Sequence, residues 1–250
     1  MRSFLFSILF LLVSASLPAQ QVDVLIARGD SAQFAMQPDV AMRLYREAER
    51  LDADNPDVLW RISKVYSDYA AQESSEEAAM RELQRSIDYA KKAVTADPRH
   101  SMAQVSLAIA YGQKAVVAPN SEKVELSRLV RQHAVRALEL ESENHVAMLV
   151  LGIWNREVAS LSWVLKLALD VVYGGLPDAS LEESHRLLQQ AMRMYPDQIM
   201  THLELAKTLK EMDDERGAKR HLRKAISLPK RDIGDRKRVD EARKLLQELT

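Results

Sequence analysis

Two neighbouring stretches, SIDYAKKAVTADP at residues 86–98 and AQVSLAIAYG at residues 103–112, set the pattern from which the fold follows. In each stretch, small and bulky apolar residues recur three or four positions apart, which is the spacing of one face of an α-helix. Asp97-Pro98 stops the first helix before the second begins. Small residues such as Ala93 and Ala108 let helices pack closely. The two stretches therefore predict neighbouring helices joined by a short turn.

The same two phrases recur along the chain. Copies of the first occupy residues 41–56, 86–98, 130–142, 184–196 and 218–229, and copies of the second occupy residues 58–66, 103–112, 147–155 and 201–209. The matching alanines of the first phrase are Ala48, Ala93, Ala137, Ala191 and Ala225. This alternation is typical of tetratricopeptide (TPR) repeats, each of which is one helical hairpin. We therefore predict an all-α, TPR-like α-solenoid, a superhelix of about five antiparallel hairpins, several with lengthened helices, closed by a basic C-terminal capping helix.

The spacing of the repeats indicates where the hairpins are enlarged. Successive alanines lie 45, 44, 54 and 34 residues apart, and only the last interval equals the TPR period of 34 residues. We expect the surplus to lengthen the first helices of the hairpins. Gly29 takes the close-packing position of the first hairpin, which begins near Leu25. Ser74-x-x-Glu77 and Ser180-x-x-Glu183 have the form of capping boxes that open second helices.

The largest surplus contains residues 158–175, VASLSWVLKLALDVVYGG. Lys166 and Asp170 interrupt this run, whereas a bilayer-spanning helix needs about 20 nearly uncharged residues. We expect the segment to extend the first helix of the fourth hairpin by several turns and to end at Gly174-Gly175. The sequence thus predicts no transmembrane span in the mature chain.

Composition narrows the classes of function. The 250 residues include no cysteine, which excludes disulfides, thiolate metal sites and thiol nucleophiles. A formal net charge of -1 offers no overall attraction for nucleic acid, so we expect no nucleic-acid partner. With only 7 glycines and 8 prolines, the chain has the composition of an all-helical protein.

The N-terminus has the pattern of an export signal. Arg2 supplies a basic start, residues 4–13 are apolar, and small residues follow that allow cleavage after Ala15 or Ala19. We predict a signal peptide at residues 1–19 and a TPR-like domain at residues 20–250. The lack of cysteine and of glycosylation sequons favours the bacterial periplasm as the destination.

Three quoted stretches carry a family resemblance: LGIWNREVASLSWVLK at 151–166, SLEESHRLLQQAMRMYP at 180–196, and AISLP with DEARKLL at 225–246. Together they resemble the TPR-like domain of the regulator of microtubule dynamics family, over roughly residues 37–248. The resemblance implies a helical adaptor or association module and no known catalysis. An exported member would meet no microtubule in a periplasm, so the family name does not by itself transfer as a function.

Residues that could carry chemistry are scattered. The six histidines form no metal-binding pair, and Glu182-x-x-His185 is only half of a di-iron motif. Phosphate-binding loops and nucleophile elbows are missing from the sequence. We therefore expect neither an enzyme nor a cofactor.

The first helices of a TPR array line its concave face, and here the corresponding positions are apolar. They are Trp60, Met102, Val105, Ile109, Val146, Leu149, Ile153, Met200 and Leu203, with Lys64, Arg156, Lys207 and Lys210 toward the edge. Because monomers seldom expose a large apolar patch, something must cover this groove. A partner helix or peptide, a lipid or other apolar ligand carried inside the superhelix, and the chain's own long helix or its neighbours are the candidates.

A basic surplus marks the C-terminal end. Residues 216–244 hold twelve Lys or Arg and four Asp or Glu. This excess suits a solvated capping helix. It also suits a docking face for an acidic protein or for anionic lipid headgroups. The residues of that predicted face are Arg220, Arg223, Lys224, Lys230 and Arg231.

Overall fold

The computed structural model describes residues 16–249. The secondary structure of these residues consists of α-helices joined by turns and short loops. The apolar stretch of the predicted export signal and its cleavage position after Ala15 lie outside these residues. The helices are α1 (Ser16–Phe34), α2 (Pro38–Leu51), α3 (Pro56–Gln72), α4 (Glu76–Ala96), α5 (Ser101–Val117), α6 (Asn120–Leu140), α7 (His145–Ala159), α8 (Trp163–Tyr173), α9 (Leu181–Met194), α10 (Ile199–Glu211), α11 (Glu215–Ser227) and α12 (Asp235–Glu248).

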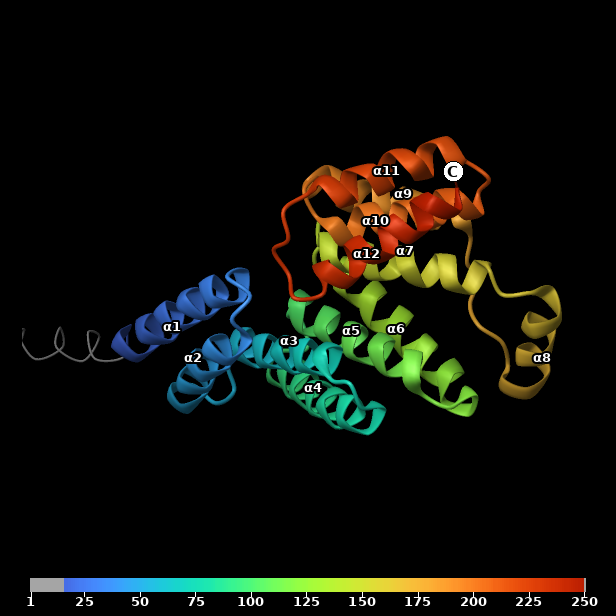
Figure 1. Ribbon diagram of the computed structural model, residues 1–250. Helices are drawn as coiled ribbons and strands as arrows, with labels where there is room; N and C mark the ends of the chain where they lie inside the picture. Colours follow the sequence, from blue (N-terminus) through green and yellow to red (C-terminus); the bar gives the residue numbers. More distant parts are fainter. Residues whose placement is uncertain (1–15, 250) are drawn as a thin grey trace, which may run out of the picture.

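The helices pack as stacked antiparallel hairpins (Figure 1). The hairpins are α1–α2, α3–α4, α5–α6, α7–α9 and α10–α11, and α12 packs against α10 and α11 at the end of the array. The first helices of successive hairpins also contact one another, as α3 does α5 and α5 does α7. The predicted all-α, TPR-like α-solenoid is confirmed.

Small residues determine how closely the hairpin helices approach. All five repeat alanines, from Ala48 to Ala225, are fully buried with 0% exposure. Gly29 faces the ring of Tyr45, and a Cβ on Gly152 would lie 2.7 Å from Cγ of Leu188. Side chains larger than these would push the paired helices apart, because the interior is close-packed.

A repeated turn starts the first helices of three hairpins. Asn55, His100 and Asn144 each accept a hydrogen bond from a backbone N–H of the helix that follows, at 2.9–3.3 Å. Each also donates its own N–H to a carbonyl three residues earlier. These side chains satisfy N–H groups that a helix leaves without partners at its start. The same turn therefore precedes three first helices because each has a capping side chain at the same position.

Longer helices take up the surplus of the second and third hairpins, but most of it lengthens the second helices rather than the first helices as predicted. The first helices α3 and α5 have 17 residues each, and the second helices α4 and α6 have 21 each. Ser180 caps α9 as predicted, through its hydroxyl and the N–H of Glu183. The predicted cap of α4 at Ser74 is wrong by one residue, since the hydroxyl of Ser75 accepts from the N–H of Ala78.

The prediction of one long first helix in the fourth hairpin is wrong. Helix α7 ends at Ala159, and α8 is a separate helix that begins at Trp163. The hydroxyl of Ser160 donates to the carbonyl of Arg156 at 2.9 Å, and that of Ser162 accepts from the N–H of Leu165 at 3.3 Å. Serine side chains that bond to the backbone in this way compete with helix continuation. The predicted end of the segment is confirmed, because Gly174 and Gly175 follow α8 with φ of 70° and 71°.

The C-terminal end of the array contacts its N-terminal helices. The loop between α11 and α12 and the start of α12 contact α1 and α3, and we call these contacts the C-terminal clasp. Asp232 lies 3.5 Å from Nζ of Lys64, and the guanidinium of Arg231 lies over the ring of Phe34. Lys237 donates to the carbonyl of Ala71. The superhelix is therefore tied between its first two hairpins and its last helix.

Candidate interaction surfaces

The nine predicted groove residues lie on the first helices α3, α5, α7 and α10. Val105, Leu149 and Leu203 among them are buried. The other six, which are half-buried, are Trp60, Met102, Ile109, Val146, Ile153 and Met200. Each of these six packs against a small cluster between adjacent hairpins.

One of these clusters shows how the groove positions are used. Leu149 of α7 packs with Leu188 of α9 and Leu205 of α10, and Ile153 and Met200 border them. The cluster thus joins the fourth hairpin to the fifth. Apolar side chains at these positions stabilise the stacking of hairpins because their surface is buried away from water. Binding of a partner along them stays a prediction.

Charged side chains border this face and pair across hairpins. Arg61 of α3 bonds Asp30 of α1 and Asp57 of its own helix, both at 2.8 Å. Lys64 lies 2.8 Å from Asp68 and reaches Asp232 of the clasp. Burial alone would lower the pKa of the Lys64 ammonium, but the two carboxylates raise it above its usual value. Lys64 therefore stays charged.

Arg156, which we expected at the groove edge, is buried. Its guanidinium bonds the carboxylate of Glu204 on α10, and both side chains are at most 5% exposed. Glu157 and Glu211 also approach the guanidinium. Burial would lower the pKa of Arg156, and Glu204 raises it above its ordinary value. The acidic partner lies 48 residues away, so no local sequence signal identifies it.

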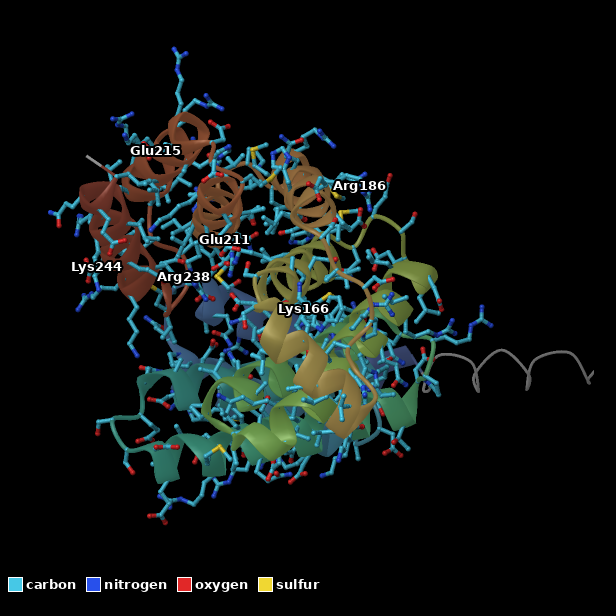
Figure 2. All side chains as sticks on the ribbon, turned by 90° about the vertical axis from the view of Figure 1, so that its right-hand side faces the viewer. Lys166, Arg186, Glu211, Glu215, Arg238 and Lys244 are labelled. Carbon is cyan, nitrogen blue, oxygen red and sulfur yellow. The ribbon has the colours of Figure 1, made fainter. Side chains whose placement is uncertain are left out.

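Lys207 and Lys210 extend the charged border onto α12. Lys207 contacts Glu204 at 3.0 Å and Glu241 at 2.7 Å, and Lys210 lies 3.1 Å from Glu248. The four basic residues at the predicted edge therefore bind acidic side chains of this chain rather than standing open. Figure 2 labels Glu211, the last residue of α10, and Arg238 of α12.

The predicted basic docking face is exposed on α11 and the loop after it. All five of its residues are exposed: Arg220, Arg223, Lys224, Lys230 and Arg231. Lys224 lies 3.2 Å from Asp197, and Arg231 belongs to the clasp. Helix α11 buries Ala218, Leu222 and Ala225 on its other side. Docking of an acidic partner on this face stays a prediction.

Each histidine has a structural contact. His100 caps α5, His133 bonds Gln104 at 2.7 Å, and His145 stacks on Tyr195 with ring centroids 3.8 Å apart. His185 bonds Gln189. The remaining two bond each other. Within residues 16–249, no group of three His, Asp or Glu side chains could hold a metal ion.

The pair His202 and His221 joins α10 to α11. Their Nδ1 atoms lie 2.9 Å apart, and Nε2 of His202 lies 2.8 Å from the carbonyl of Pro196. A carbonyl only accepts, so Nε2 of His202 carries the proton and its Nδ1 accepts from Nδ1–H of His221. Burial lowers the pKa of both imidazoles, that of His221 to about 4. The pair is neutral near pH 7.

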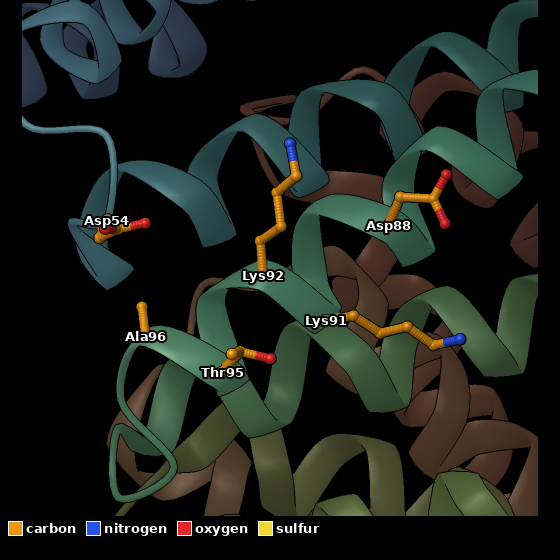
Figure 3. A pocket seen from close by; sticks show the side chains of 6 residues that line it. All are labelled: Asp54, Asp88, Lys91, Lys92, Thr95 and Ala96. Atoms are coloured by element: carbon orange, nitrogen blue, oxygen red, sulfur yellow. The ribbon is translucent and has the colours of Figure 1, made fainter.

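Two open hollows mark the surface. The first, of about 510 Å³, lies beside α4 and is lined by Asp54, Asp88, Lys91, Lys92, Thr95 and Ala96 (Figure 3). Its lysines and carboxylates point into open space rather than toward a common centre. The second, of about 410 Å³, lies between α11 and α12 and is lined by Ile226, Arg243, Leu246 and Gln247. Leucine and isoleucine make the second hollow the more apolar one.

Helix α8 stands apart from the stacked hairpins, at the right-hand edge of Figure 1. In the described part of the chain it makes no extended packing contact with another helix. Lys166 donates to the carbonyl of Ala159, and Arg128 donates to that of Gly175, so both ends are held. Val171 and Val172 are 79% and 65% exposed. None of the helices within residues 16–249 combines the length and apolarity needed to cross a bilayer.

Known proteins resemble this chain in sequence and in fold. The regulator of microtubule dynamics protein 1 of Caenorhabditis elegans is 26% identical over 76% of this chain and 84% of its own length. The mouse protein of the same name is 25% identical over 92% of this chain and 75% of its own length. A thermophilic TPR protein of Thermus thermophilus superposes with a TM-score of 0.62 at 15% identity, over 88% of this chain and 98% of its own.

These similarities agree with the helical architecture. The Thermus structure supports the fold alone, because its sequence identity is low. The family model described as regulator of microtubule dynamics protein 1-3 matches residues 19–250, which include all of the described hairpins except the first three residues of α1. The chain therefore belongs to the regulator of microtubule dynamics protein 1-3 family.

Proposed function

We propose that this chain is a non-catalytic interaction scaffold that receives a helix or peptide of a partner protein along the first helices of its hairpins. The observation that carries the proposal is the run of six half-buried apolar side chains on α3, α5, α7 and α10, from Trp60 to Met200. Half-buried aliphatic and aromatic side chains can contact an added helix without unpacking the hairpins. The TPR-like fold and the family support the same class of function.

Charge would orient the partner. The ion pairs of Arg61, Lys64 and Lys207 border the apolar positions. A partner segment with an apolar stripe and charged flanks would match both features, since complementary charges align partners. The basic face around Arg220 and Arg223 offers a second contact, for an acidic protein segment or for anionic headgroups.

A carrier of a lipid or another apolar ligand is the alternative function for the same positions. Val105, Leu149 and Leu203 are already enclosed by neighbouring hairpins. Their burial favours the scaffold, because a carried acyl chain would have to displace these packed side chains.

Site-specific photocrosslinking tests the proposal. A photoreactive residue replaces Ile109 on α5, and a matched one replaces the exposed Glu139 on the second helix α6. After purification from the native host, we expect position 109 and not position 139 to crosslink a stoichiometric protein. Equal crosslinking from both positions, or none, would contradict binding on the first helices. Stoichiometric lipid in place of protein would assign the carrier function instead.

We also propose that the chain is exported, with the bacterial periplasm as its destination. The proposal rests on the basic, apolar and small-residue order of residues 1–19. The intact mass of the protein from its native host tests it. We expect a chain that begins at Ser16 or Gln20, and a protein that retains Met1 would contradict cleavage.

A further inference from the structure

Helix α8 exposes an apolar side that, among the described residues, no other helix packs against extensively. Leu165, Ala168 and Val172 lie at i, i+3 and i+7, Val171 lies beside them, and all four are exposed. Anchors at this spacing are what an amphipathic helix presents to a groove. An isolated helix of 11 residues is also marginal in water, so packing against another surface would stabilise it.

The charges around α8 argue against a membrane as that surface. Residues 160–182 carry three acidic residues and one lysine. Helices that lie in a membrane interface are rich in Lys and Arg on their polar face. In the sequence of α8, Lys166 and Asp170 are the charged residues, and the other nine residues are aliphatic or aromatic. A protein groove can enclose such a wide apolar surface.

This chain offers a groove of matching chemistry. The hollow between α11 and α12 is lined by Ile226 and Leu246, with Arg243 and Gln247 at its side. Ile226 and Arg243 of this hollow belong to the segment 216–244, where basic residues exceed acidic ones by eight, and Leu246 and Gln247 lie just after it. Arg223 precedes Ile226 by one helical turn and is exposed. An apolar floor within a basic region complements an apolar helix within an acidic one.

We propose that α8 of one copy docks in the α11–α12 hollow of a second copy. If each copy places its α8 in the hollow of the other, the two contacts form a closed dimer. If each copy instead docks into the next, the contacts form an open-ended filament. The proposal does not rest on the scaffold function, because crosslinking at Ile109 concerns the first helices and can fail or succeed independently.

Sedimentation equilibrium over a concentration series tests this contact. The wild-type chain is expected to associate reversibly. Val171→Glu/Val172→Glu alters exposed side chains of the helix, and Arg243→Glu/Gln247→Glu alters exposed side chains of the hollow. Each double variant is expected to weaken association at least about tenfold, since it puts charge against apolar surface or acid against acid. Val116→Glu is the matched control, because Val116 is 76% exposed and lies at the end of α5.

Mixing the two double variants makes the test specific. The helix variant keeps an intact hollow and the hollow variant keeps an intact helix, so the mixture should form pairs and nothing larger. A wild-type chain that stays monomeric, a mixture that fails to pair, or a Val116→Glu variant that loses association equally would overturn the proposal. Flotation of wild type, but not of the helix variant, with phosphatidylcholine vesicles would also overturn it by assigning α8 to a lipid surface.

Discussion

At the scale of single residues, the close contact between α7 and α9 of the fourth hairpin depends on Gly152. A Cβ there would lie 2.7 Å and 2.9 Å from Cγ and Cδ2 of Leu188, which is itself fully buried. Leu188 cannot move aside without disturbing Leu149 and Leu205. Gly112, in contrast, faces Val130 with room for a methyl group at 3.7 Å.

These two glycines predict opposite effects of the same substitution. Gly152→Ala should lower the free energy of unfolding by about 1–3 kcal/mol, because it overpacks the contact between α7 and α9. Gly112→Ala should raise it by up to about 1 kcal/mol, because alanine favours the helix and meets no clash. Urea denaturation followed by circular dichroism measures both. Equal effects would show that α9 adapts freely to α7.

At the scale of elements, a buried ion pair ties the fourth hairpin to the fifth. Arg156 on α7 and Glu204 on α10 are both withdrawn from water. A buried charge that loses its partner is costly, whereas an exposed pair contributes little. Arg186 and Glu183 on α9 form an exposed pair at 2.6 Å that serves for comparison.

Glu204→Gln should therefore cost about 3 kcal/mol of stability or more, and Glu183→Gln less than about 1 kcal/mol. Arg156→Met combined with Glu204→Leu should restore part of the loss, since no unpaired charge then remains at that pair. Thermal unfolding of the four proteins at one pH compares them. Similar losses for Glu204→Gln and Glu183→Gln would mean that water reaches Arg156.

The pair of histidines makes the contact between α10 and α11 sensitive to acid. Burial lowers the pKa of His221 to about 4, and the unfolded value is about 6.5. Between these values the unfolded chain binds the proton and the folded chain does not. The free energy of unfolding should therefore fall as the pH falls from about 6.5 to 4, and this contribution is fully present only above that range.

His221→Gln isolates this contribution. The glutamine amide can still donate to Nδ1 of His202 but does not titrate. Urea unfolding at pH 7, 5.5 and 4.5 should show a smaller loss of stability for the variant than for the wild type. Parallel losses would show that carboxylates elsewhere account for the acid sensitivity.

At the scale of the whole molecule, the C-terminal clasp determines how open the superhelix is. Asp232 contacts Lys64 of α3 and also bonds Arg238 at 2.7 Å. Burial would raise the pKa of Asp232, but Lys64 and Arg238 lower it below its usual value, so it stays charged. Solenoids have contacts mainly between neighbours, and this one adds a tie across the array.

Asp232→Ala combined with Lys237→Ala should release the tie and widen the array. The chain has no cysteine of its own. Spin labels would therefore attach specifically to the cysteines introduced by Ser31→Cys and Lys230→Cys. Pulsed dipolar spectroscopy should give a narrow distance distribution in the parent and a broader, longer one in the variant. Asp240→Ala, which affects only the exposed pair with Arg243, should leave the distribution unchanged. An unchanged distribution in the double variant would contradict the clasp.

The fold class, the five packing alanines and the close-packing Gly29 were all predictable from the sequence. Each follows from the size of residues that recur at helical spacing. These residues decide packing within a single hairpin, which is only a few dozen residues long. The half-buried groove positions were predictable as apolar positions on first helices for the same reason. Their packing between hairpins, as with Leu149 against Leu205, depends on how the hairpins stack.

Contacts between distant segments were decided only by the tertiary structure. The pairing of Arg156 with Glu204 and the clasp of Asp232 on Lys64 have no periodic signal in the sequence. Local spacing specifies which side of each helix is buried, because that choice is made within one or two turns. Which charges meet depends on the curvature summed over all the hairpins, and small rotations at each interface together bring the last helix back to the first.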